Sequence, residues 1–220
     1  MSEPACDPSA AEASGRRLRW AAAAGLIAIA AGMTVFTATR MDLTSRLGYF
    51  NPTLAVMLLL AAYRPVRRTG LALVLAIPAA AAIGILLVKQ DIGWVIYPSL
   101  PFVLLGYLAH GACGFGLRGV TTNGQPAKVI GTAFVGAALF FLISNFGVWL
   151  VGFNSAAPSY PMTLEGLAVC YERALPFFEK QLFALALVPA LFSRPVLDLL
   201  CVRQSRTVSA SPALAVAETR

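Results

Sequence analysis

Apolar residues fall into six long runs along the chain, and polar or charged residues gather in the short stretches between them. A helix that crosses a bilayer needs about 20 mainly apolar residues, and each run approaches or exceeds this length. The predicted spans cover residues 20–38, 47–63, 70–88, 94–117, 129–152 and 182–200. The pattern therefore predicts an all-α integral membrane protein, built as a bundle of six transmembrane helices.

A different pattern separates the fifth and sixth runs. From Leu164 to Phe178 the apolar residues recur at helical spacing, which is typical of a short amphipathic helix. Thr163 can serve as its N-cap, and Pro176 is expected to kink or end it. The polar flank is acidic, with Glu165, Glu172 and Glu179. Such a helix either rests on the membrane interface or covers a cavity.

Composition excludes a soluble domain of this size, because 58% of the residues are apolar, 12% are charged and the mean hydropathy is +0.74. The net charge of +7 could indicate a nucleic-acid partner. The basic residues, however, stand next to the ends of the apolar runs, so membrane topology explains them better and no nucleic acid is expected.

The distribution of Lys and Arg predicts the orientation of the spans. One side collects Arg16, Arg17, Arg19, Arg64, Arg67, Arg68, Arg118, Lys128, Arg203 and Arg206. The other holds Arg40, Arg46, Lys89, Arg173 and Lys180, which acidic residues balance. By the positive-inside rule both termini are cytoplasmic, and the amphipathic helix between helices 5 and 6 is external. The expected location is the bacterial cytoplasmic membrane.

The ends of the chain are polar and rich in small residues. Residues 1–15 and 205–220 are expected to be disordered cytoplasmic tails on either side of a membrane domain at 16–204. A basic stretch before the first run could also mark a secretory signal. A retained first helix is favoured, because the run is long enough to span and further spans follow.

Small residues recur every four positions in two of the runs. The third span holds Ala72, Ala76, Ala80 and Gly84, and the first span holds Ala24, Ala28 and Gly32. Such a stripe lets another helix approach closely. It could bind a partner subunit, form an internal interface, or arise by chance in an alanine-rich chain.

Asn145 stands out, because it lies inside the apolar fifth span and is followed by an aromatic segment. A buried amide in a membrane helix either bonds a neighbouring helix or lines a cavity that binds a ligand. The candidate ligand-binding residues are Asn51, Asn145, Trp149, Tyr160 and Tyr171.

Three blocks of sequence resemble a family of bacterial membrane proteins, the domain of unknown function 6580 family, for which a role in transport has been suggested. The blocks are Phe50 to Thr53, Ser144 to Trp149 and Tyr160 to Phe178, within a resemblance that runs from about Leu47 to Leu191. The layout is similar to the substrate-binding S components of energy-coupling factor transporters. This resemblance implies a small-molecule solute, and as partners a coupling membrane subunit and an ATPase.

The chain departs from the family pattern at two places. Glu179, Lys180 and Gln181 replace a turn that usually contains Gly and Asp, and Ile83 to Leu87 lacks an acidic residue. Any role that relies on those acids is not expected here.

Several catalytic patterns are missing from the sequence. It contains no P-loop, no paired carboxylates within the spans and no metal-ligand cluster, so neither an enzyme nor a cofactor or metal site is expected. His110 is expected to be packed or hydrogen-bonded, with a ligand or proton relay as the alternative. The sequence thus predicts a small-solute transport protein or substrate-binding membrane subunit. The alternative is a structural or assembly subunit without its own ligand.

Overall fold

The computed structural model describes residues 8–40, 52–63, 67–152 and 160–200, and this part of the chain is helical without strands. The helices are α1 (Pro8–Arg40), α2 (Thr53–Tyr63), α3 (Arg67–Lys89), η1 (Ile92–Trp94), α4 (Leu100–Cys113), η2 (Gly114–Leu117), α5 (Pro126–Gly152), α6 (Leu164–Leu185), α7 (Val188–Leu191) and α8 (Arg194–Leu200). Asn51 and residues 1–7 and 201–220 lie outside the described residues. Residues 8–15 of the predicted N-terminal tail form the first turns of α1.

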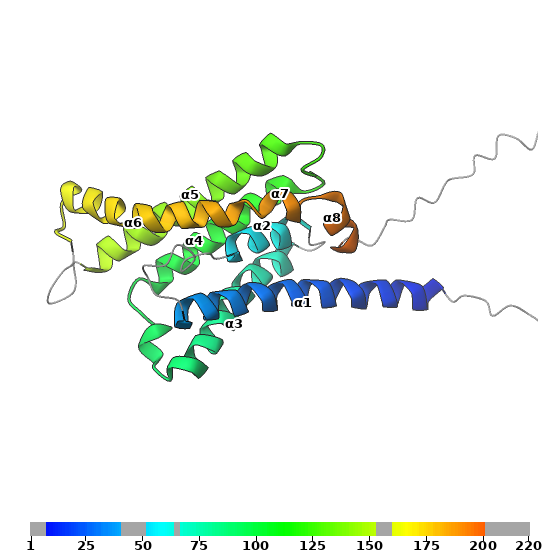
Figure 1. The fold of residues 1–220 in the computed structure, drawn as a ribbon, viewed down its shortest axis with the longest axis horizontal. Helices are drawn as coiled ribbons and strands as arrows, with labels where there is room; N and C mark the ends of the chain where they lie inside the picture. Colours follow the sequence, from blue (N-terminus) through cyan, green and yellow to red (C-terminus); the bar gives the residue numbers. More distant parts are fainter. Residues whose placement is uncertain (1–7, 41–51, 64–66, 153–159, 201–220) are drawn as a thin grey trace, which may run out of the picture.

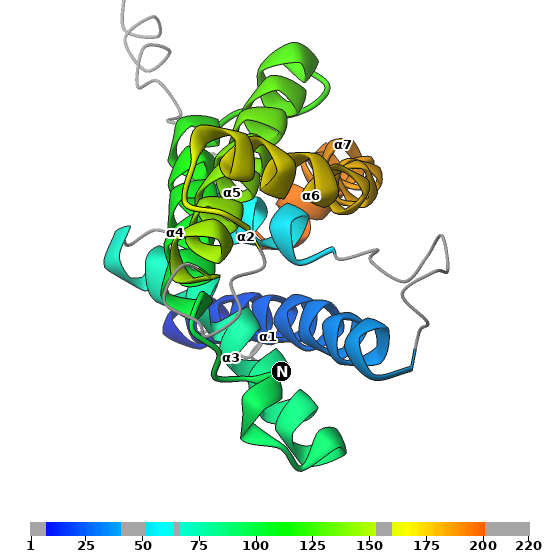
Figure 2. The same ribbon diagram turned by 90° about the vertical axis from the view of Figure 1, so that its left-hand side faces the viewer.

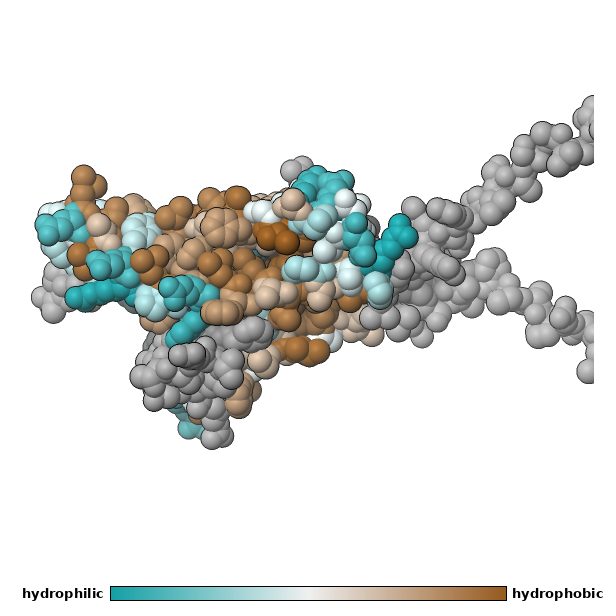
Figure 3. Space-filling model, turned by 45° about the horizontal axis from the view of Figure 1, so that its top comes forward, coloured by the Kyte–Doolittle hydropathy of each residue, from teal (hydrophilic) through white to brown (hydrophobic). Residues whose placement is uncertain are grey.

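Four helical segments of the described chain are long and apolar enough to cross a bilayer: Trp20–Thr39, Leu100–Leu117, Pro126–Gly152 and Leu164–Leu191. Two shorter apolar helices, Thr53–Ala62 and Val74–Lys89, correspond to the second and third predicted spans. Figure 3 shows a broad hydrophobic band between two more hydrophilic ends. These features agree with a membrane protein, with fewer full-length spans than the sequence predicted.

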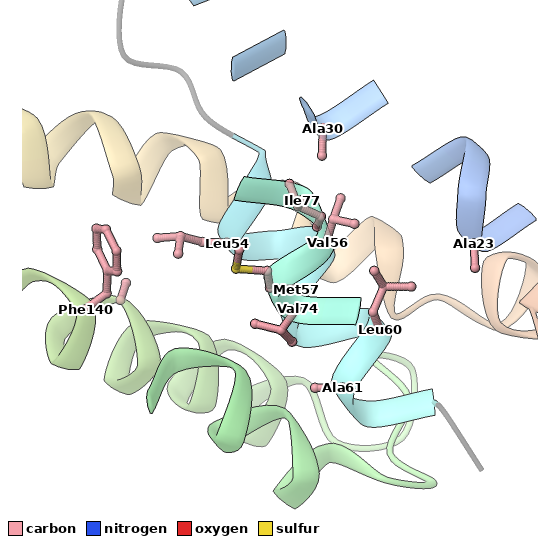
Figure 4. Packing of buried hydrophobic residues seen from close by; sticks show 11 residues of the cluster. Ala23, Ala30, Leu54, Val56, Met57, Leu60, Ala61, Val74, Ile77 and Phe140 are labelled. Atoms are coloured by element: carbon pink, nitrogen blue, oxygen red, sulfur yellow. The ribbon is translucent and has the colours of Figure 1, made fainter. Parts of the chain in front are cut away.

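The short helix α2 forms the centre of the molecule. In both ribbon views it lies between α1 on one side and the α5–α6 pair on the other (Figures 1 and 2). Its residues from Thr53 to Ala62 are all buried, and Met57, Leu58 and Leu59 are completely inaccessible. In Figure 4, Met57 and Leu60 of α2 lie close to Val74 of α3. The hydrophobic core is therefore built around α2.

The predicted second span begins at residue 47, whereas α2 begins at Thr53, directly after Pro52. Proline lacks a backbone donor and fits the start of a helix, and the Val56 amide donates to the Pro52 carbonyl. At 1.5 Å per residue the 11 residues of α2 extend about 16 Å, roughly half of a hydrocarbon core.

The fourth predicted span begins later than expected. Trp94 belongs to η1, and α4 starts at Leu100 with Pro101 in its first turn. The last turn tightens into the 3₁₀ helix η2, which contains Gly114 and Gly116. The run from residue 94 to 117 is thus not one continuous α-helix, because it starts with a 3₁₀ turn and ends in a second one.

The amphipathic segment is not a separate short helix. Thr163 caps it as predicted, with its Oγ1 accepting a hydrogen bond of 3.1 Å from the Gly166 amide. Pro176, however, does not end the helix, and α6 continues to Leu185 along α5. Proline removes one backbone bond, and packing against a neighbouring helix can offset this loss. The remainder of the predicted sixth span is broken into α7 and α8, which contain Pro189 and Pro195 in their first turns.

Candidate functional site

The candidate site lies where α5 and α6 run side by side in opposite directions. The Tyr171 hydroxyl donates to the Leu142 carbonyl at 2.9 Å, and the Trp149 indole donates to the Pro161 carbonyl at 3.0 Å. Between them, the Cys170 thiol donates to the Asn145 carbonyl at 3.5 Å. The structure thus brings Asn145, Trp149 and Tyr171 together along one helix pair.

The Asn145 side chain is half-buried in this contact. Its Nδ2 donates to the Phe141 carbonyl of the same helix at 2.8 Å. Its Oδ1 accepts no hydrogen bond from any residue that the structure describes. The amide therefore does not bond a neighbouring helix, which was one of the two expectations for it.

Aromatic rings line the same helix pair. The Phe141 ring centroid lies 4.8 Å from that of Phe178 and 5.6 Å from that of Tyr171. The Phe146 ring, next to Asn145 in the sequence, lies 5.5 Å from the Trp149 ring. Aromatic rings thus precede and follow Asn145 on α5, and such rings favour contact with a planar or apolar group.

Tyr160 precedes α6 and is half-buried. The Arg173 guanidinium carbon lies 5.7 Å from its ring centroid, a cation–π contact that connects Tyr160 to the first half of α6. No described contact joins it directly to Asn145. Asn51, the remaining candidate, lies outside the described residues.

Polar contacts at the start of α2 were not predicted from the sequence. The hydroxyls of Thr34 in α1 and Thr53 in α2 are 3.0 Å apart, and Thr53 is almost completely buried. Thr53 is the first residue of α2, and its partner Thr34 lies 19 residues earlier, so no local sequence pattern pointed to this contact.

His110 is completely buried in α4 and joins it to α2. Its Nε2 lies 2.8 Å from the Leu54 carbonyl, and because a carbonyl only accepts, Nε2 carries the proton. Nδ1 lies against the backbone of Gly136 in α5 without a hydrogen bond of acceptable geometry. The expectation of a packed, hydrogen-bonded histidine is confirmed. In the described chain no group of three or more His, Cys, Asp or Glu residues could hold a metal.

The two stripes of small residues have different surroundings. A Cβ added to Gly84 of α3 would lie 2.6 Å from Val35 Cγ2 of α1, so Gly84 belongs to the α1–α3 interface. Ala76 is half-buried, and Ala72 and Ala80 are exposed. In α1, by contrast, Ala24, Ala28 and Gly32 are exposed, and nothing lies within 4 Å of a Cβ added to Gly32.

Comparison with protein families supports the resemblance that the sequence blocks indicated. Neither a curated protein nor a solved structure matches the chain. The family described as "Family of unknown function (DUF6580)" matches residues 15–200. This match includes all of the candidate site, and the chain belongs to the DUF6580 family.

Proposed function

We propose that this chain is a small-solute transport protein, or a substrate-binding membrane subunit, of the bacterial cytoplasmic membrane. The observation that carries the proposal is the Asn145 side chain, whose amide nitrogen bonds its own helix while its oxygen has no partner among the described residues. A polar group in a membrane helix is costly unless it is used. An incoming donor group of a solute would complete the hydrogen bonding of Asn145.

The way α5 and α6 are joined supports this proposal. The hydrogen bonds of Tyr171, Trp149 and Cys170 connect the α5 side of the contact to the α6 side. An asparagine that served only to hold helices together would be expected to bond across the contact. The Asn145 side chain is not used in this way and is available to a ligand.

Two further polar atoms inside the described bundle are buried without a hydrogen bond, namely His110 Nδ1 and Gln181 Oε1. Buried polar atoms are almost always paired, so unpaired ones often indicate water or a bound group that completes the site. They support a polar interior rather than a purely apolar one. We expect energy to come from partners, since the sequence has no P-loop; the similarity to S components suggests a coupling membrane subunit and an ATPase.

The test combines ligand screening with a matched pair of asparagine variants. The purified protein in detergent is screened by thermal shift against vitamins and other small solutes. A solute that raises the melting temperature of the wild type should have little effect on Asn145→Ala. Asn123→Ala, in an exposed turn between η2 and α5, should keep the full shift. If Asn145→Ala stays folded and binds the solute as the wild type does, the proposal fails.

A second candidate function is a structural or assembly subunit without its own ligand. The observation that favours it is the open face of α1 at Ala28 and Gly32, where another helix could approach closely. This function predicts a partner protein that co-purifies with the wild type and is lost on Ala28→Leu. Ala79→Leu, a matched change at an exposed alanine of α3, should keep the partner. Recovery of the same partner with Ala28→Leu would exclude this face.

A further inference from the structure

An ordered turn connects α3 to α4. Gln90 directly follows α3 with a φ of 53°, a left-handed conformation that non-glycine residues seldom adopt, and its amide donates to the Leu86 carbonyl at 2.8 Å. Asp91 then caps η1, because its Oδ1 accepts a 2.8 Å hydrogen bond from the Gly93 amide. Hydrogen bonds between backbone groups continue through the turn as far as Ile96. The chain here has a defined shape.

This defined turn exposes large apolar side chains. We call them the Trp94 surface, which consists of Leu87, Val88, Ile92, Trp94, Ile96 and Tyr97. Leu87 is 74% exposed, Ile96 63% and Trp94 52%. A group of exposed apolar side chains of this size usually marks a contact with a membrane or with another protein.

The Trp94 surface continues an apolar face of α3. Ile83 and Leu86, which precede it on α3, are also exposed. Gly84 contacts Val35 of α1, so the last turns of α3 lie level with the last turns of α1, which ends at Arg40. Figure 1 shows α1 ending towards the left and α3 ending towards the lower left. The surface therefore lies at the edge of the apolar part of the molecule.

Charged groups stand at the same edge. Lys89 and Asp91 are the only charged residues in the sequence between Arg68 and Arg118. The Lys89 ammonium lies 4.6 Å from the Trp94 ring centroid, so the cation and the indole form a cation–π contact. Tryptophan and tyrosine beside a lysine at the end of an apolar helix are the side chains that gather where acyl chains meet headgroups.

We propose that the Trp94 surface docks into the boundary between the headgroups and the acyl chains of a phospholipid bilayer. Ile92 and Ile96 enter the acyl chains, the Trp94 and Tyr97 rings lie at the boundary, and Lys89 and Asp91 stay with the headgroups. The left-handed Gln90 and the Asp91 cap hold the chain in the shape that presents these side chains together. This turn thereby fixes the depth of the α3 end in the membrane.

Depth-dependent quenching tests the proposal directly. The full chain with Trp20→Phe and Trp149→Phe keeps Trp94 as its only fluorophore of this type. It is reconstituted into phosphatidylcholine and phosphatidylglycerol vesicles with bromine atoms placed either near the headgroup end or near the methyl end of the acyl chains. A second protein that keeps only Trp149, which is half-buried and bonded to Pro161, serves as the comparison. Flotation confirms that each protein is in the vesicles.

The expected result is a loss of Trp94 emission that is larger with bromine near the headgroups than with bromine near the methyl ends. An equal or larger loss with the deep bromine overturns the proposal, as does no loss. In the latter case, disulfide cross-linking of Ile96→Cys tests whether a second copy covers the surface. If the double variant does not fold, the unaltered chain is labelled with fluorotryptophan and studied by fluorine NMR in vesicles that carry spin-labelled lipids. The Trp94 resonance is assigned by its loss in Trp94→Phe. It should broaden most when the spin label lies near the headgroups.

Discussion

At the scale of single residues, His110 shows how a polar side chain is accommodated in an apolar helix bundle. Its protonated Nε2 donates to the Leu54 carbonyl and thereby connects α4 to α2. The other edge of the ring rests on Gly136 of α5, where a side chain would not fit. One imidazole thus contacts three helices, and its place depends on the absence of a Cβ at Gly136.

Gly136→Ala should destabilise the protein. The new methyl group would lie 2.6 Å from His110 Nδ1, and such overpacking costs about 1–3 kcal/mol. Gly131→Ala, five residues earlier on α5, meets nothing within 4 Å and should be neutral or stabilising by up to about 1 kcal/mol. Thermal unfolding in detergent measures both. Equal melting temperatures for the two variants would show that the ring does not need Gly136.

Sequence reasoning identified Asn145 and His110 as residues that need an explanation, because polar side chains in apolar runs are few. It could not identify their partners. The acceptor of Asn145 is the Phe141 carbonyl one turn away, and that of His110 is a backbone group 56 residues distant. Backbone acceptors have no residue-type signature, so these bonds become visible only when the helices are placed.

At the scale of elements, the α5–α6 pair has the most informative contacts. Its hydrogen bonds go mostly from side chains of one helix, or of the loop between them, to backbone carbonyls of the other segment. The acceptors are backbone carbonyls, and both α5 and α6 remain continuous helices where these bonds are made. This arrangement holds α6 against α5 on both sides of Asn145.

Tyr171→Phe should weaken this pair. The change removes the bond from the hydroxyl to the Leu142 carbonyl but keeps the ring beside Phe141, so the expected loss is about 0.5–1.5 kcal/mol. Tyr160→Phe keeps the ring that Arg173 contacts and removes no described hydrogen bond, so it should unfold as the wild type does. The melting temperatures in detergent decide this. A wild-type value for Tyr171→Phe would mean that the hydroxyl bond adds nothing.

The limits of helix prediction are clearest at the prolines. Pro52 directly precedes α2, and Pro101 lies in the first turn of α4, positions at which proline fits the start of a helix. Pro176, which was predicted to kink or end its helix, lies inside α6. The difference is the long contact with α5, and a contact between distant segments cannot be read from local sequence.

At the scale of the whole molecule, the two small-residue stripes separate an internal interface from an open face. Gly84 packs against Val35 of α1, whereas nothing lies within 4 Å of a Cβ added to Gly32. From the sequence, both stripes allowed the same explanations, because spacing alone does not say which neighbour is present. The apolar runs were sufficient to predict an all-helical membrane protein. They did not indicate the short α2, which begins directly after Pro52, or the breaks at Pro189 and Pro195.

Gly84→Leu and Gly32→Leu should therefore differ. The first places a large side chain against Val35 and should cost about 1–3 kcal/mol in the isolated chain. The second points into open space and should leave the melting temperature of the purified protein within experimental error. If the stripe on α1 binds a partner, Gly32→Leu alone should abolish that complex while the chain stays folded. A large loss of stability for Gly32→Leu would place this stripe inside the protein instead.

The burial of α2 from Thr53 to Ala62 also has a consequence for the order in which the protein is made. The residues that cover α2 come from α1, α3 and α4, but also from α6 and α7 near the other end of the chain. During synthesis the second helix leaves the ribosome long before α6 and α7 exist, so part of its surface waits uncovered in the membrane. Final assembly must then follow translation of the last helices, and chains truncated before α6 should be recognised by quality-control proteases and degraded.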